Sequence, residues 1–174
     1  VSNHQIRRAL YAVTRDQDNI AWLTGRTIVS ARTDATCAEV MLDDGTRLTA
    51  QLLVAADSRF SQVREQLGIA ASINRIGRAM LVCRVAHEAD HEGIATEWFD
   101  HGQTIAMLPL NGRRSSAVLT LPQAQVEALA ALPPDALGAE LTRRFAGRLG
   151  AMRVEDRAHV YPLATTWSHH FAAT

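Results

Sequence analysis

An aspartate, two serines and two arginines are gathered in LLVAADSRFSQVR, which covers residues 52–64. The apolar run LLVAA is typical of a short strand buried on both faces, and it ends directly before Asp57. Ser58 or Ser61 can cap a short helix that continues to Leu67. A buried strand, a polar turn and a helix N-terminus offer main-chain N–H groups to a phosphate or a sugar. The segment therefore indicates a place where such a ligand can bind.

Other patterns that carry chemistry are weaker. His87 and His91 fall on a predicted strand end and loop, where a spacing of four does not align side chains. His169 and His170 are adjacent and point apart in an extended chain, and the two cysteines lack ligand spacing. The G-x-S-x-G motif of serine hydrolases is absent from the sequence. We expect neither a metal site nor a hydrolase triad.

The composition excludes several classes of protein. All eighteen basic residues are arginine, so the chain has no Walker A, Schiff-base or kinase-type lysine. Eighteen acidic residues balance them, and no charge excess points to nucleic acid or an anionic membrane. With 174 residues, 47% of them hydrophobic, the chain suits one compact domain or pieces of two. No apolar run approaches the roughly 20 residues of a transmembrane helix. The cysteines are expected to be free thiols of a reducing compartment.

The helix and strands expected before the polar segment, in residues 1–50, are short. Apolar residues recur at helical spacing in residues 1–16, which predicts a helix. Residues 26–50 favour two or three strands. Asp44-Gly45 is a strong hairpin signal, and Thr33-Asp34 is a second plausible turn.

A different pattern follows a candidate boundary near residues 70–76. Residues 76–121 alternate apolar strands with polar or Gly-containing turns, which predicts an antiparallel meander of about four strands. Residues 122–149 turn helical, and residues 152–163 predict a further strand. The expected fold class is α/β, or α+β for this length of chain.

The polar segment resembles the second flavin motif of the single-component aromatic hydroxylases, flavoproteins built like para-hydroxybenzoate hydroxylase. That motif places Asp-Gly after an apolar strand, followed by two variable residues, Ser, one variable residue, an aliphatic residue and Arg. Asp57, Ser61, Val63 and Arg64 match these positions, and Ser58 stands where the family usually has glycine. Serine adopts a positive φ less readily than glycine does.

The resemblance covers nearly the whole chain. VSNHQIRRAL looks like the family's helix beneath the flavin, with Asn3 at a cofactor-contacting position. Residues 91–122 resemble the substrate-domain sheet of the ubiquinone-biosynthesis hydroxylases, and ADSRFS is similar to their demethoxyubiquinol hydroxylase branch. Residues 159–171 resemble the strand that leads to the last flavin motif. The G-x-G-x-x-G motif and the late Gly-Asp motif are absent, so we expect the middle part of a longer hydroxylase.

The resemblance implies a domain order and a reaction. Residues 1–75 would form a partial FAD-binding domain, 76–163 a mostly antiparallel substrate-binding sheet packed by helices, and 164–174 a return towards the FAD-binding domain. In this family NAD(P)H reduces FAD, and O2 supplies one oxygen atom to an electron-rich ring without a metal. The isolated chain is expected to be inactive and to hold FAD weakly.

The resemblance also implies roles for particular residues. The residues expected to bind cofactor are Asn3, Asp57, Ser58 and Arg64, those expected to line the substrate pocket are Trp98 and Met107, and no catalytic residue is assigned. The expected substrate is a small hydrophobic quinol or phenol of ubiquinone biosynthesis, with no nucleic-acid partner. The intact enzyme is expected in the cytoplasm, where peripheral contact with the inner membrane or a ubiquinone-biosynthesis complex is compatible with the resemblance. The alternative is a noncatalytic α+β binding or interaction domain with a chance motif match.

Overall fold

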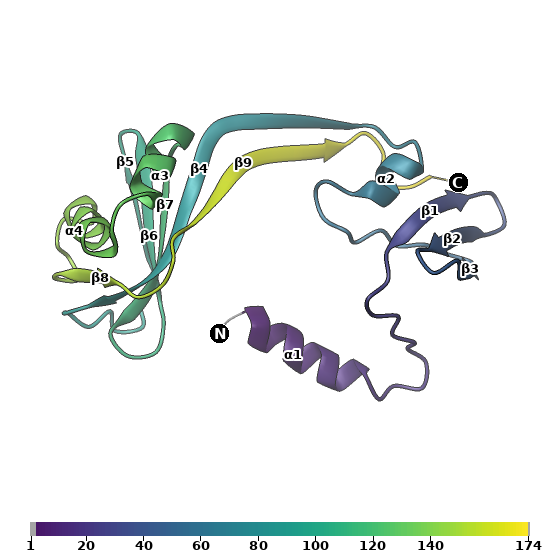
Figure 1. The fold of residues 1–174 in the computed structure, drawn as a ribbon, viewed down its shortest axis with the longest axis horizontal. Coiled ribbons are helices and arrows are strands. Elements are labelled where there is room, and N and C mark those ends of the chain that lie inside the picture. Colours follow the sequence, from purple (N-terminus) through teal and green to yellow (C-terminus); the bar gives the residue numbers. More distant parts are fainter. Residues whose placement is uncertain (1–2, 174) are drawn as a thin grey trace. The chain divides into compact units, whose positions relative to one another are not determined.

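The computed structural model describes residues 3–173, which divide into two compact units (Figure 1). Unit 1 comprises the described residues up to Asn74 together with those from Thr165 onwards, and unit 2 comprises Arg75–Ala164. In chain order, the elements are α1 Asn3–Thr14, β1 Ile28–Thr33, β2 Ala38–Leu42, β3 Arg47–Ala50, α2 Gln62–Gln66, β4 Ala71–His87, β5 Thr96–Asp100, β6 Gln103–Pro109, β7 Arg114–Pro122, α3 Gln123–Ala130, α4 Pro134–Arg144, β8 Met152–Val154 and β9 His159–Ser168. The fold is mixed α/β with antiparallel sheets, as expected. The roles expected for the units in cofactor and substrate binding stay predictions.

Unit 1 contains an antiparallel three-stranded sheet in the order β1-β2-β3. The predicted hairpin at Asp44-Gly45 is confirmed, since Gly45 has a φ of +84° and joins β2 to β3. At the other turn, Asp34 Oδ1 accepts the N–H groups of Thr36 at 2.7 Å and Cys37 at 2.9 Å. These local hydrogen bonds fix the β1–β2 connection without help from distant residues.

Helix α1 is confirmed, but its apolar side is exposed. None of its described residues is buried, and Leu10 and Val13 are among the exposed large hydrophobics. Its fixed contacts are local: the Tyr11 and Trp22 rings meet edge to face at 5.0 Å between centroids. The Trp22 indole N–H donates to Thr14 O at 3.4 Å. The helical spacing of the apolar residues thus predicts the helix correctly, but the apolar side of the helix is exposed.

The prediction of a buried strand at LLVAA is wrong. The structure assigns no strand to residues 52–56, and the side chains of Leu52 and Val54 are 76% and 74% exposed. A strand buried on both faces needs hydrogen-bonded neighbours, and β3, the strand before it, pairs with β2 instead. Among residues 3–173, no strand pairs with this segment. The apolar run therefore remains extended and uncovered.

Unit 2 is built on a sheet in the order β5-β6-β7-β4-β8, with β9 also paired to β4. The antiparallel sheet of about four strands predicted over 76–121 is confirmed by the pairs β5–β6, β6–β7 and β7–β4. Only β5, β6 and β7 form a meander, because β4 pairs with β7 and not with β5, the next strand in the chain. Along β7 buried residues alternate with part-exposed ones, so one face of the sheet enters a core. This alternation is what the sequence pattern of the strands predicts.

Helices α3 and α4 pack on this sheet, as predicted for residues 122–149. Their apolar residues share one buried cluster with the strands: Leu81, Val85, Ile105, Leu119, Val126, Leu137, Leu141 and Phe145 are members. Helix α4 lies close to β8, and a Cβ at Gly138 would stand 2.4 Å from Met152 O. The Thr142 hydroxyl also accepts the Met152 N–H at 2.9 Å. Glycine at this position lets the helix backbone approach the strand.

The candidate boundary near residues 70–76 coincides with the division between the two units, which falls between Asn74 and Arg75, and β4 runs across it without a break from Ala71 to His87. One detail of the expected layout differs. The single strand expected over 152–163 is two strands, β8 and β9, separated at Asp156. The Asp156 carboxylate accepts the Arg84 main-chain N–H at 2.7 Å and the Arg84 Nε–H at 2.8 Å, and these bonds interrupt the strand between β8 and β9.

No helix within residues 3–173 is long and apolar enough to cross a membrane.

Candidate functional site

The turn before α2 brings the carboxylate and hydroxyl of the motif onto the start of the helix. Asp57 Oδ2 accepts the Val63 N–H at 3.2 Å, and Ser61 Oγ accepts the Arg64 N–H at 2.9 Å. Ser61 is the N-cap of α2. Two of the main-chain donors that the sequence offered to a ligand are thus already satisfied by side chains.

Asp57 is stabilised in its ionised form. Hydrogen bonds from the Ser61 hydroxyl and the Val63 main chain hold the pKa of its carboxyl below the ordinary value, although partial burial acts in the other direction. A negative charge at the beginning of a helix also interacts favourably with the helix dipole. Asp57 therefore fixes the turn, whatever else it contacts.

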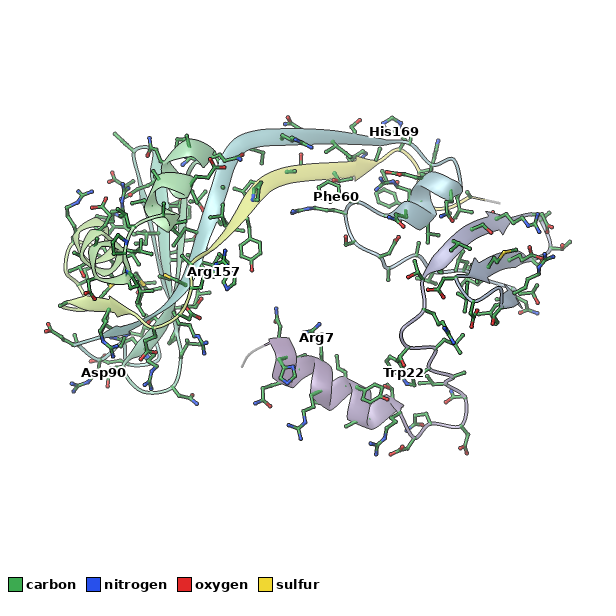
Figure 2. The ribbon with its side chains drawn as sticks, viewed as in Figure 1. Arg7, Trp22, Phe60, Asp90, Arg157 and His169 are labelled. Carbon is green, nitrogen blue, oxygen red and sulfur yellow. The ribbon has the colours of Figure 1, made fainter. Side chains whose placement is uncertain are left out.

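Ser58 has a φ of +82°, in the left-handed region where glycine is favoured. This is the position at which the resembling flavin motif carries glycine. The backbone path that glycine would allow is therefore kept in this chain, with a serine in a strained conformation. Figure 2 labels Phe60 in the same turn, and its ring centroid lies 5.0 Å from the guanidinium carbon of Arg59.

A cavity of about 690 Å³ lies beside this turn within unit 1. Its walls come from four separate segments of the chain. The lining residues are 33–38, 51–55, 58, 59, 61, 64, 67, 69, 166, 168 and 170–173. The motif residues Ser58, Ser61 and Arg64 line it, whereas Asp57 faces the helix N-terminus instead. The cavity is the candidate functional site.

Two polar atoms beside this cavity lack a partner among the described residues. The Arg64 side chain is only 11% exposed; its Nη1–H donates to Arg59 O at 3.1 Å, but its Nε is buried without a hydrogen bond. Thr166 Oγ1 is likewise buried and unpaired. Because an unsatisfied buried polar group is costly, the cavity suits an occupant that offers polar atoms to both side chains.

The structure does not bring all the expected site residues to this cavity. Asn3 is the first described residue of α1 and is exposed, and it does not line the cavity. Met107 is a core residue of unit 2, 2% exposed. Trp98, in the same unit, packs its ring 6.4 Å from that of Phe145 and beneath the Arg148 guanidinium at 4.6 Å. The assignment of Asn3, Trp98 and Met107 to ligands stays a prediction.

Sequence reasoning missed the contribution of residues 166–173 to the cavity walls. Thr166 and Ser168 lie about a hundred residues after the motif, and nothing local marks them as neighbours of Arg64. The His169 main-chain N–H donates to Ala70 O at 2.9 Å, which ties this segment to the chain just after α2. The only signal was the resemblance of residues 159–171 to a strand that leads to another flavin motif.

The expectation that His87 and His91 do not align is wrong. The loop that contains Asp90, labelled in Figure 2, turns back so that the two rings lie 5.6 Å apart. The Gly93 N–H donates to His91 Nδ1 at 2.9 Å. The Nε2 atom of His91 therefore carries the ring proton and donates it to Leu110 O at 2.9 Å. His87 lies between Ala89 O at 2.7 Å and Ser115 Oγ at 3.0 Å. All four ring nitrogens are engaged, which indicates a structural role for the pair.

Comparisons with known proteins identify relatives of the chain. It is 41% identical over 163 residues to the ubiquinone hydroxylase UbiM of Neisseria meningitidis, an alignment that covers 94% of this chain and 35% of UbiM. It is 37% identical over 153 residues to the ubiquinone hydroxylase UbiL of Rhodospirillum rubrum, covering 88% of this chain and 36% of UbiL. No family model matches the chain.

A solved structure shares the fold. HpxO of Klebsiella pneumoniae, crystallised with FAD and uric acid, superposes with a TM-score of 0.62 at 20% sequence identity, over 94% of this chain and 43% of HpxO. The chain is thus similar in sequence to two ubiquinone hydroxylases and shares the fold of part of HpxO. It spans about a third of the length of the two hydroxylases.

Proposed function

We propose that this chain is the middle part of an FAD-dependent monooxygenase that hydroxylates an aromatic ring in ubiquinone biosynthesis. The observation that carries the proposal is the 41% identity to the ubiquinone hydroxylase UbiM over 94% of the chain. The shared fold with HpxO, which binds FAD, supports the cofactor. Because the chain spans 35% of UbiM, the remaining parts of the FAD and substrate sites would come from outside it. A noncatalytic domain with a chance motif does not account for similarity along nearly the whole chain.

The residues around the unit 1 cavity fit an anionic, polar cofactor. Arg64 Nε and Thr166 Oγ1 are buried without partners among the described residues, and Ser58 has a positive φ at the position where the flavin motif carries glycine. In the proposed site, Arg64 would supply positive charge and hydrogen-bond donors to the phosphate-bearing part of FAD. Asp57 would hold the turn in shape through its bond to the Val63 N–H. Asn3 would approach the cofactor from α1.

When bound, FAD would take reducing equivalents from NAD(P)H and direct one oxygen atom of O2 to an electron-rich ring. The part left to this chain is to bind the cofactor, orient the substrate and exclude water. Unit 2 has its own packed core, which suits a rigid wall for a small hydrophobic quinol or phenol. Trp98 is partly exposed and suits direct contact, whereas Met107 would support the wall from within the core.

The proposal extends to location. A substrate with a prenyl tail resides in the membrane, so a cytoplasmic enzyme would meet it by peripheral association with the inner membrane. Partners in a ubiquinone-biosynthesis complex would also bring this substrate to the enzyme.

The test uses a protein of the relatives' length that contains this chain. We expect it to copurify with FAD, to oxidise NADH or NADPH, and to transfer label from ¹⁸O2 to a quinol or phenol product. Asp57→Ala should lower the FAD content, while Asp90→Ala, which alters an aspartate-stabilised turn of unit 2, should leave it unchanged. An unlabelled product, or hydroxylation without flavin, would refute the assignment.

A further inference from the structure

A second hollow, of about 370 Å³, is formed entirely within unit 2. It lies where the β5–β6 turn, the end of β7 and the end of α4 meet, and it is lined by Arg78, Arg143 and Arg144. Arg78 comes from β4 and the other two from the last turn of α4, so elements distant in sequence converge on it. None of its lining residues belongs to the cavity of unit 1.

The guanidinium of Arg144 is held rigidly at the edge of the hollow. Its side chain is 18% exposed, its Nε–H donates to Glu140 Oε1 at 2.7 Å, and its Nη1–H donates to Gln103 Oε1 at 2.5 Å. These bonds leave Nη2 of Arg144 without a partner in any hydrogen bond of the described residues. A guanidinium fixed in this way loses little conformational entropy when it binds an anion.

Arg78, which lines the same hollow, is also anchored. Its Nη2–H groups donate to Gly102 O in the β5–β6 turn at 2.6 Å and to Thr120 O in strand β7 at 3.3 Å. Its Nε–H and Nη1–H make no hydrogen bond to the described residues. The anchoring positions the side chain and still leaves donors for a ligand.

The charges around the hollow do not cancel. Three guanidinium groups face two carboxylates: Asp100 on the rim and Glu140, which pairs with both Arg143 and Arg144. This local positive excess stands out in a chain with no net charge. Planar N–H donors in a shallow basic hollow are the chemistry that recognises phosphate oxygens. We propose that this hollow binds the phosphate group of a small molecule.

The test is titration of a protein of the relatives' length that contains this chain with inorganic phosphate at constant ionic strength, measured by calorimetry and by chemical-shift changes. Saturable binding of one phosphate per chain is expected. Arg143→Gln should weaken it roughly tenfold, because a charge-assisted hydrogen bond is lost. Arg78→Gln should weaken it at least as much. The control is Arg153→Gln, which removes an equally exposed arginine of unit 2 that also pairs with a glutamate; it should change the affinity less than twofold.

A second arm separates a free phosphate from a lipid headgroup. The same protein is sedimented with vesicles of phosphatidylglycerol or of phosphatidylcholine. If it binds phosphatidylglycerol vesicles through Arg143 but does not bind free phosphate, the phosphate recognised by the hollow is that of a lipid headgroup. The proposal is overturned if neither probe binds saturably, or if Arg153→Gln weakens binding as much as Arg143→Gln. Circular dichroism of each variant verifies that the comparison is between folded chains.

Discussion

The carboxylate of Asp57 accepts the main-chain N–H of Val63 at 3.2 Å, across the turn that begins α2. This contact spans six residues and joins the end of an apolar run to a helix of five residues. So short a helix has little stability of its own, because nucleation costs more than a few hydrogen bonds return. The side chains of Asp57 and Ser61 therefore define the turn that the cofactor proposal relies on.

Asp57→Ala should lower the free energy of unfolding by about 1 kcal/mol at pH 7, the usual net contribution of one hydrogen bond, because the Val63 N–H loses its acceptor. The pKa of Asp57 is lowered in the folded chain, so its contribution is present above the unfolded carboxyl pKa of about 3.9 and fades as pH falls below it. Urea denaturation at pH 7 and pH 3 measures both values. The gap between wild type and variant should narrow at pH 3, and an equal gap at both would contradict the assignment.

Ser58→Gly should stabilise the chain by about 0.5–1 kcal/mol, because glycine adopts the φ of +82° without strain. Ser30→Gly is the matched control, since Ser30 is an exposed residue of β1 and glycine weakens a strand interior. The two substitutions are expected to have opposite signs in urea denaturation. Destabilisation by both would show that the Ser58 conformation carries no strain.

Gly138→Ala should destabilise unit 2 by about 2 kcal/mol or more, although alanine is the better helix former. The added Cβ would lie 2.4 Å from Met152 O, and a main-chain oxygen cannot move aside cheaply. Ala139→Gly, at the next and exposed position of α4, calibrates helix propensity and should cost about 1 kcal/mol. Thermal unfolding followed by circular dichroism ranks the two variants. A neutral Gly138→Ala would mean that α4 and β8 are not this close.

Asp34 should titrate at an unusually low pH. Hydrogen bonds from the Thr36 hydroxyl and main chain, and from the Cys37 main chain, lower the pKa of its carboxyl to about 2. The stabilisation from these bonds is complete above the unfolded pKa of about 3.9 and is lost as pH falls towards 2. NMR titration of the carboxyl carbons measures the value directly. In Thr36→Val, which removes the hydroxyl donor, the pKa of Asp34 should rise towards the ordinary range.

Local signals in the sequence predicted much of the fold. Asp44-Gly45 specified a hairpin because its glycine accepts positive φ, and alternation in residues 76–121 specified the antiparallel strands, although not the pairing of β4 with β7. The polar turn of the candidate site was also local, since Asp57, Ser61 and Arg64 act within one turn of chain. Features that depend on residues close together in the sequence could therefore be predicted from the sequence.

Features that depend on contacts between residues far apart in the sequence could not be predicted in this way. The LLVAA run has strand composition, but composition does not supply the adjacent strand that would bury Leu52 and Val54. The proximity of His87 and His91 follows from a loop reversal that spacing alone cannot describe. The cavity wall formed by Thr166 depends on a segment about a hundred residues from Arg64.

The pairing of β9 with β4 makes unit 2 an insertion with neighbouring ends. Two main-chain bonds flank the crossing: His169 N–H to Ala70 O and Glu155 N–H to Arg84 O, both at 2.9 Å. Residues 75–164 thus leave and re-enter unit 1 on adjacent strands, about 4.8 Å apart in a sheet. Excising or exchanging them requires closing only a short gap, which costs little chain entropy. Unit 2 can therefore diversify, or be exchanged, without redesign of the turn before α2 in unit 1.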